Sequence, residues 1–228
     1  GLDIIDRVFK ILDNKVVFTK IVNDGENVNK GDIIAQIQGK TRALLKGERT
    51  ALNILQRLSG ISSKTREICN MVNDLPVSIA DTRKTIPGMR ILEKYAVKTG
   101  GGSNHRYSLS DGVLIKDNHI AAAGSIKKAI ECAKKAAPHT AKIEVETESI
   151  NEVKEALEAK ADIIMLDNMS IEMMKQAVDI INSRATVEAS GNITIDNIRE
   201  VALTGVNIIS IGALTHSVKA MDISMKIR

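Results

Sequence analysis

Short apolar runs alternate with amphipathic segments through the last two thirds of the chain. The runs are rich in β-branched and aliphatic residues, as is typical of buried strands. They are Val77–Ala80, Val113–Ile115, Ile143–Val145, Asp162–Leu166, Thr186–Ala189 and Asn207–Ile211. The segments between them have helical spacing and cover residues 89–98, 124–137, 149–160, 170–182 and 194–204. This alternation predicts βα units around a parallel sheet, either an open doubly wound sheet or a closed α/β barrel.

The first third has a different pattern. Residues 15–39 show short apolar alternations broken by Asn-Asp-Gly and Lys-Gly-Asp, which is turn chemistry between short strands. Residues 46–73 read as one long helical stretch, with Gly60 as its expected break. We therefore expect a small α+β domain with the long helix over 1–73 and an α/β domain over 74–228. The first residues are already in apolar periodicity, so we expect the N-terminal domain to be incomplete.

Composition is that of a globular chain. Its 228 residues are 43% hydrophobic and 26% charged, enough to build a full-sized core. No apolar run approaches the length of a membrane span and no signal peptide opens the sequence, so no membrane partner is expected. The two cysteines, Cys69 and Cys132, are too few for a disulfide scaffold and fit a reducing, cytoplasmic location.

The charge balance favours a small anionic ligand. The formal net charge is +4, and the chain has no Trp, two Tyr and two Phe. So few aromatic rings leave little stacking surface for single-stranded nucleic acid, and no nucleic-acid partner is expected. A modest positive charge suits an anionic small molecule at least as well.

Polar, charged or glycine residues stand at the end of every predicted strand. In chain order they are Asp81, Arg83 and Lys84; Lys116, Asp117 and His119; Glu144 and Glu146; Asp167 and Asn168; Glu188, Ser190 and Gly191; and Gly212. The carboxyl ends of parallel strands meet at one face, and that face is where ligands bind. The pattern therefore predicts one ring of charge and favours an enzyme.

Several of these residues also have a simpler structural interpretation. Arg83 and Lys84 form either a solvated surface pair or an anion clamp. Lys116 makes either a salt bridge with Glu144 or Asp167, or a ligand contact. The residues alone leave both choices open.

The acidic residues leave similar alternatives. Glu144 and Glu146 are two apart on one strand and point to the same side, so their repulsion needs Lys116, a magnesium ion or sugar hydroxyls nearby. Asp167 is either the cap of the helix beginning near Ser170 or a ligand contact.

The last two strand ends predict an anion site. EASGN (188–192) and IGAL (211–214) each place small residues just before a helix, where backbone N–H groups attract anions. No GxGxxG fingerprint follows a strand and no P-loop exists, which disfavours NAD and ATP. His105 and His119 lack the spacing of a zinc site.

Six motifs in order resemble nicotinate-nucleotide pyrophosphorylase (carboxylating), also called quinolinate phosphoribosyltransferase. They are ERTALNILQRLSGIS (48–62), DTRKTIPGMRILEKYAVKTGGGSNHRYSLSDGVLIKDNHI (81–120), IEVET (143–147), IIMLDN (163–168), EASGN (188–192) and GVNIISIGALTHSVKAMDIS (205–224). The resemblance covers nearly the whole chain. It implies a sandwich-like N-terminal domain followed by an α/β barrel with fewer strands than a TIM barrel, here about six βα units.

The resemblance also implies the reaction. Quinolinate and 5-phosphoribosyl 1-pyrophosphate (PRPP) would give nicotinate mononucleotide, pyrophosphate and carbon dioxide in de novo NAD biosynthesis, with Mg2+ as cofactor. Lys116, Glu146 and Asp167 would be catalytic, the two acids serving the ribose hydroxyls and magnesium. Arg49 would reach into a neighbouring subunit's site, which implies a homodimer or a higher homo-oligomer.

The remaining residues that the resemblance assigns would bind substrate. Those implied for quinolinate and pyrophosphate are Thr82, Arg83, Lys84, His105, Arg106 and Lys116. Those implied for the 5'-phosphate are Ser190, Gly191, Asn192, Ile211, Gly212 and Ala213. Asn192 departs from the family, where many relatives have a second glycine.

Two other functions fit the same residues. One is a related phosphoribosyltransferase-like protein, acting on nicotinate or associated with molybdenum transport. The other is a non-catalytic protein that binds anions with the same basic ring. A clamp suited to two carboxylates favours quinolinate over nicotinate.

Overall fold

The computed structural model describes residues 1–227, which divide into two compact units. The first contains residues 1–66, residues 85–101 and the described chain from Ala213 onwards; the second contains residues 67–84 and 102–212. The units interleave along the sequence, so each of the predicted domains, 1–73 and 74–228, holds residues of both. The division into domains at residue 73 stays a prediction.

The first unit combines helices with a two-stranded antiparallel sheet. Its elements are α1 (Leu2–Leu12), β1 (Val17–Lys20), β2 (Ala35–Gln38), most of α2 (Thr41–Asn70), α3 (Arg90–Thr99) and α9 (Ala213–His216). Buried side chains of α1 and α2, together with Val16, form its core. Phe9 is only 1% exposed, and a Cβ at Gly47 would lie 2.6 Å from its ring. Glycine at that position therefore lets α1 pack closely on α2.

The expected break of the long helix at Gly60 is wrong. α2 continues through Gly60 to Asn70 as one helix. A Cβ at Gly60 would lie 2.3 Å from the backbone oxygen of Lys219. The glycine therefore allows the C-terminal segment to pack against the helix, rather than ending it.

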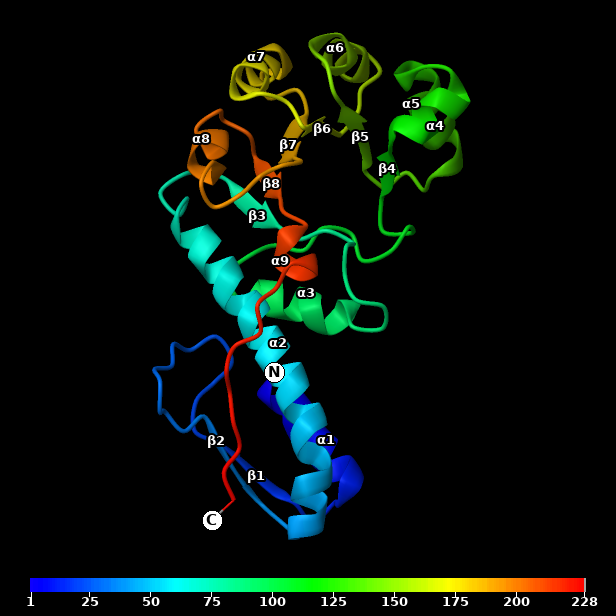
Figure 1. Cartoon of the computed structure of the whole chain (residues 1–228). Coiled ribbons are helices and arrows are strands. Elements are labelled where there is room, and N and C mark those ends of the chain that lie inside the picture. Colours follow the sequence, from blue (N-terminus) through cyan, green and yellow to red (C-terminus); the bar gives the residue numbers. More distant parts are fainter. Residues whose placement is uncertain (228) are drawn as a thin grey trace. The chain divides into compact units, whose positions relative to one another are not determined.

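The second unit is a parallel sheet with helices between its strands. The strands are β3 (Ser78–Ala80), β4 (Val113–Ile115), β5 (Ile143–Thr147), β6 (Ile163–Asp167), β7 (Thr186–Ser190) and β8 (Ile208–Ser210). The helices are α4 (Asp117–Ala123), α5 (Ile126–Ala136), α6 (Ile150–Glu158), α7 (Ile171–Ile181) and α8 (Ile198–Ala202). Figure 1 shows α4 to α7 fanned along the outside of the curved sheet. The predicted strands are confirmed, whereas α4 was not predicted.

The strand order is that of an α/β barrel rather than of a doubly wound sheet. The order is β3-β8-β7-β6-β5-β4, so the first strand of the unit pairs with the last. β3 and β4 are the two ends of the hydrogen-bonded series, and Ser103 forms a parallel bridge with Ala80 of β3. The segment 102–112 therefore runs beside the open side of the barrel. The predicted α/β class with about six strands and a small N-terminal sheet is confirmed.

Side-chain hydroxyls fix where three of these helices begin. Ser125, Ser149 and Ser170 each accept a hydrogen bond from the backbone N–H three residues later. Such capping satisfies one of the N–H groups that a helix leaves without an internal partner. Since Ser170 caps α7, Asp167 does not, and that structural interpretation of Asp167 is wrong.

Over residues 1–227, no helix has the length and apolar character needed to cross a bilayer.

Candidate active site

Strand alternation places the acidic residues on the inner side of the barrel. Ile115, Val145, Ile164 and Val187 lie in register across four strands and are all buried. Because successive side chains point to opposite faces, this aliphatic row packs under the helices. The residues on either side of it in sequence face the other way, and these include Glu144, Glu146 and Glu188.

Lys116, Glu146 and Asp167 lie at the carboxyl edge of the sheet, whereas Glu144 is in register with Ile163, the first residue of β6. Glu146 is in register with Met165, and Asp167 pairs with Ser190 two residues further on. Lys116 follows β4, whose last residue Ile115 is in register with Val145. The convergence predicted for Lys116, Glu146 and Asp167 is therefore confirmed as a placement, while their catalytic roles stay predictions.

Lys116 forms an ion pair with Glu146. The Lys116 ammonium group contacts Glu146 Oε1, and 46% of the Lys116 side chain is exposed. The expected alternatives, Glu144 and Asp167, are thus not its salt-bridge partners. The pair brings a cation and a carboxylate from neighbouring strands to the site edge, where both can reach a bound ligand.

His119 has a local structural role. Its Nδ1 atom accepts a hydrogen bond of 2.9 Å from the backbone N–H of Lys116, at the start of α4. This contact orients the first turn of the helix that follows Lys116.

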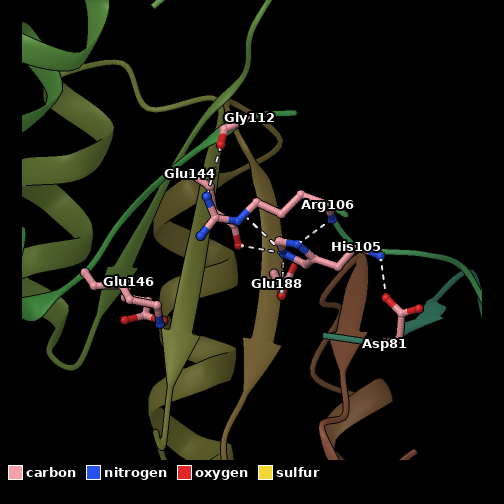
Figure 2. A network of polar contacts seen from close by, with 8 residues as sticks. Asp81, His105, Arg106, Gly112, Glu144, Glu146 and Glu188 are labelled. Carbon is pink, nitrogen blue, oxygen red and sulfur yellow. Dashed lines mark hydrogen bonds and ion pairs between the residues drawn. The ribbon is translucent and has the colours of Figure 1, made fainter. Parts of the chain in front are cut away.

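His105 lies against two buried glutamates (Figure 2). Its Nε2 atom is 3.2 Å from Glu144 Oε2 and 3.6 Å from Glu188 Oε1. Glu144 is 5% exposed and Glu188 only 1%. Burial, and after it the nearby Glu144 carboxylate, raises the pKa of the Glu188 carboxyl to about 7. The strand ends thus contain an acid that tends to keep its proton at neutral pH.

Three further contacts hold the His105–Arg106 segment. The backbone N–H of His105 donates to Asp81 Oδ1 at 2.8 Å, and Asp81 is itself fully buried. The backbone N–H of Arg106 donates to His105 Nδ1 at 2.9 Å, and Arg106 Nη1 donates to the carbonyl of Gly112 at 3.1 Å. Figure 2 shows these contacts in one network with the two glutamates.

Arg106 lies close to a second cation. Burial lowers the pKa of its guanidinium group, and the positive charge of Arg83 lowers it further. Glu144, Glu146 and Asp111 act in the opposite direction. Two neighbouring guanidinium groups favour an anion between them, since each gains from a shared negative partner. This arrangement favours the clamp interpretation of Arg83 over a solvated surface pair.

The loop after β7 is connected to the end of β6 by side-chain amides. Asn192 Nδ2 donates to Asn168 Oδ1 at 2.9 Å, and Asn168 Nδ2 donates to Asp167 Oδ2 at 2.9 Å. Gly191 has φ +86°, and a Cβ there would lie 2.1 Å from Asn168 Oδ1. Glycine is thus required at position 191, and Asn192 links the predicted phosphate loop to Asp167.

The other predicted binding residues are placed as follows. The Ile211 N–H donates to the carbonyl of Ala80, so it is already used within the sheet. The backbone N–H of Lys84 donates to Thr82 Oγ1, a local turn contact. Arg49 is exposed on α2 of the first unit, and Ala213 begins α9. The roles predicted for these residues stay predictions, as do those of Ser190 and Gly212.

Sequence reasoning placed Asp81, Glu144 and Glu188 in the ring of charge but gave them no role in binding or catalysis. Asp81 directly follows β3, whereas Glu144 and Glu188 lie within β5 and β7, where strand parity places both on the same side as Glu146. That parity was the available signal for Glu188. No sequence signal predicted the contact of these glutamates with His105, because that contact depends on how the segment after Gly102 runs beside β3.

Comparison with known proteins identifies the family. The chain matches the model of the quinolinate phosphoribosyl transferase N-terminal domain over residues 1–59 and that of the C-terminal domain over residues 61–226.

Three relatives illustrate how close the match is. The chain is 48% identical, over its whole length and 78% of the relative, to a probable nicotinate-nucleotide pyrophosphorylase (carboxylating) of Bacillus subtilis. It is 42% identical to quinolinate phosphoribosyltransferase (decarboxylating) 1b of Nicotiana tabacum, covering all of this chain and 69% of that protein. The crystal structure of NadC from Streptococcus pyogenes superposes with a TM-score of 0.95 at 46% identity, covering 99% of this chain and 80% of that one. The chain therefore belongs to the quinolinate phosphoribosyl transferase family.

Proposed function

We propose that this chain transfers the phosphoribosyl group of PRPP to the ring nitrogen of quinolinate, with loss of carbon dioxide. The products are nicotinate mononucleotide and pyrophosphate, a step in NAD biosynthesis. Membership of the family supports this over the whole length of the chain. The observation that carries it is the meeting of clustered cations and carboxylates at the carboxyl edge of one parallel sheet.

The paired cations suit a substrate with two carboxylates. Arg83 and Arg106 lie close enough to lower the pKa of the Arg106 guanidinium, after the larger effect of burial. A guanidinium group offers a planar fork that binds a carboxylate with two hydrogen bonds. Two such groups, with Lys84 in the adjoining loop, would hold quinolinate and orient its ring nitrogen toward the sugar.

The loop after β7 suits the 5'-phosphate. Gly191 places no side chain where this loop passes closest to Asn168, and Asn192 holds the loop to Asn168 by a hydrogen bond. Residues 190–192 would bind the phosphate of PRPP and so fix the ribose near the end of β6. Asp167, at that strand end, is then placed to accept hydrogen bonds from ribose hydroxyls.

Magnesium is the proposed cofactor. Glu146 and Asp167 offer carboxylate oxygens, the hard donors that Mg2+ prefers, and this ion is commonly held by one or two carboxylates together with substrate phosphates. The residues present therefore fit it, and Glu146 and Asp167 would hold it. When bound, the ion would offset negative charge on the pyrophosphate.

The chemistry follows from these charges. As the bond from ribose C1 to pyrophosphate breaks, the bonding electrons leave with pyrophosphate and positive charge develops at C1. The carboxylates of Glu146 and Asp167 stabilise that charge, and Lys116 stabilises the leaving group. The quinolinate ring nitrogen forms the new bond to C1. The resulting pyridinium takes up the electron pair released when the neighbouring carboxylate leaves as carbon dioxide, and a proton replaces it on the ring carbon.

The test is a balanced turnover assay with a matched pair of variants. Protein, quinolinate, PRPP and Mg2+ should yield nicotinate mononucleotide and carbon dioxide in equal amounts. Arg106→Ala should lower kcat/KM for quinolinate about a hundredfold, because a charged clamp contact is lost. Arg199→Ala is the control, since Arg199 makes an exposed ion pair with Asp74, and such pairs contribute little.

The other outcomes separate the remaining functions. Turnover of nicotinate in place of quinolinate would indicate a related transferase with a different substrate. Binding of both ligands with no carbon dioxide released would indicate an anion-binding protein. Either result, or full activity of Arg106→Ala, would contradict the proposal.

We also propose that the active form is a homo-oligomer of at least two chains, in which Arg49 of one chain serves the site of another. Arg49 is exposed on α2, so its guanidinium group is available to a neighbouring subunit.

A further inference from the structure

The buried cluster of His105, Glu144 and Glu188 has no role in the mechanism above. One polar atom from each residue lies within 4.8 Å of the others. Two carboxylates this deeply buried are costly unless their charges are offset. The cluster therefore needs a physical explanation beyond packing.

The hydrogen bonds fix where the His105 proton lies. Nδ1 accepts the backbone N–H of Arg106, so it presents a lone pair there. A neutral imidazole has one N–H, which must then be on Nε2. Nε2 faces both carboxylates, at 3.2 Å from Glu144 and 3.6 Å from Glu188. His105 is thus a neutral donor to the glutamates and not a cation that offsets them.

One N–H donor is too few for two buried carboxylates. Within residues 1–227, Glu188 Oε1 has no hydrogen-bond partner, and Glu188 is 1% exposed. The charged or polar groups that face it are Glu144 and Glu146 on β5, His105, and the Ser210 hydroxyl on β8. His105 and the Ser210 hydroxyl lower the Glu188 pKa, but burial and the like charges of Glu144 and Glu146 raise it by more.

The two glutamates differ in their access to positive charge. Glu144 lies near enough to the Arg106 guanidinium to raise the pKa of that arginine, against the larger effects of burial and Arg83. Glu188 has no such neighbour among its facing groups, and burial raises its pKa to about 7. Glu188 is therefore the member of the pair that tends to hold a proton.

We propose that Glu188 is a positioning residue for the transfer reaction: as a neutral acid beside Glu144, it holds the His105 ring in the orientation that fixes the backbone of Arg106. This rests on the proposed function, in which Arg106 binds quinolinate. The contacts run from Glu188 and Glu144 to His105 Nε2, and from His105 Nδ1 to the Arg106 N–H. Asp81 holds the same segment from β3 through the His105 N–H.

His105, Glu144 and Glu188 are residue types that ligate metal ions, but the hydrogen bond on His105 Nδ1 disfavours a metal site here. A metal at Nε2 needs the lone pair of that atom, which would move the proton to Nδ1. The Arg106 N–H already points at Nδ1, so two hydrogens would meet there. A proton on Glu188 requires no such rearrangement.

Two variants of Glu188 test the proposal through kinetics. Glu188→Gln keeps a planar neutral group and should retain KM for quinolinate and kcat within about threefold. Glu188→Leu removes both polar atoms and should raise KM for quinolinate about tenfold, with a smaller change in kcat, because the polar contact 3.6 Å from His105 Nε2 is lost. Glu200→Gln, exposed on α8, is the control. Equal losses in the Gln and Leu variants, or no loss in either, would overturn the proposal.

The pH dependence of kcat/KM for quinolinate distinguishes this role from a purely structural one, which would not change that dependence. In the wild-type protein, kcat/KM for quinolinate should fall as pH rises through about 7, where Glu188 ionises. Glu188→Gln should lack this decline. A decline of the same midpoint in both proteins would assign it to another group and contradict the proposal.

A measurement without substrate separates this proposal from the proposed function. The chain has four histidines, so nitrogen-15 spectra of histidine-labelled protein are simple to assign with His105→Asn. His105 should show a protonated Nε2 and an unprotonated Nδ1 at neutral pH, whatever reaction the protein catalyses. The opposite tautomer, or a stoichiometric bound metal ion lost in Glu188→Gln, would show a metal site and overturn the proposal.

Discussion

The charged residues of the candidate site differ in how the free-energy cost of burying their charge is offset. Lys116 and Glu146 offset each other directly and remain partly exposed. For Glu188, burial and the nearby Glu144 carboxylate outweigh the favourable contacts and raise its pKa to about 7. The second arrangement makes a buried acid sensitive to pH within the range in which enzymes work.

This sensitivity predicts a pH-dependent stability. The ordinary pKa of a glutamate is 4.5 and that of folded Glu188 about 7, so the folded state holds its proton more tightly. The stabilisation is complete below about pH 4.5 and is lost as pH rises to about 7. The difference is worth about 3 kcal/mol at most, from about 1.4 kcal/mol per pKa unit.

Urea denaturation of wild type and Glu188→Gln between about pH 5 and pH 8 measures this. The free energy of unfolding of the wild type should fall relative to that of the variant as pH rises, and level off above about pH 7. A constant difference across the range would show that Glu188 is ionised throughout or does not titrate.

The position of a site residue could be predicted from the sequence where strand periodicity alone determines it. Its contacts could not be predicted where they involve residues distant in the sequence. The strand-end position of Glu146 and Asp167 follows from strand periodicity alone, and the structure places them as expected. The partner of Lys116 was predicted wrongly, since Glu144 and Glu146 share one face and sequence does not say which of them the lysine reaches. The placement of His105 against Glu188 was missed, because it depends on the course of an irregular segment.

At the scale of elements, periodicity predicted strands better than helix ends. All the strands of the second unit were predicted to within two residues, since short aliphatic runs between turns leave little choice. α4 was missed because it follows Lys116 directly, and the next helical segment was expected to begin only at residue 124. A helix break was predicted at Gly60 because glycine weakens helices. In the structure the glycine is explained by close packing against the C-terminal segment.

The packing of α2 predicts the effect of adding a methyl group at Gly60. Alanine is the better helix former by about 1 kcal/mol, but its Cβ would lie 2.3 Å from the Lys219 backbone oxygen. We expect Gly60→Ala to lower the free energy of unfolding by about 1–3 kcal/mol, measured by urea denaturation. Ser63→Ala, exposed on the same helix, is the control and should be neutral or slightly stabilising. Stabilisation by both would mean that the C-terminal segment does not pack this closely.

At the scale of the whole molecule, the sequence predicted the class of architecture through its alternation of strands and helices. It did not predict how the chain divides into compact units, because residues 85–101 belong to the first unit although they lie between two segments of the second. Local patterns carry no information on such long-range returns of the chain.

The proposed assembly gives a test at this scale. If Arg49 serves the site of another chain, then Arg49→Ala and Arg106→Ala should each lose activity alone. An equimolar mixture of the two variants should regain about a quarter of the wild-type activity, because about half of the dimers are hybrids and one of the two sites in each hybrid keeps both arginines. Sedimentation of the same samples checks that the oligomers form. No recovery in verified hybrids would show that Arg49 acts within its own chain or not at all.

The open side of the barrel has a consequence for ligand entry. β3 and β4 end the hydrogen-bonded series, and the strip of chain from 102 to 112 lies there with only Ser103 bridged to a strand. That strip carries His105 and Arg106. Local opening of residues 102–112 would displace the side chains proposed to bind the pyridine ring. Binding of the ligand should therefore order this segment at the same time, which would be visible as slower amide hydrogen exchange in residues 102–112.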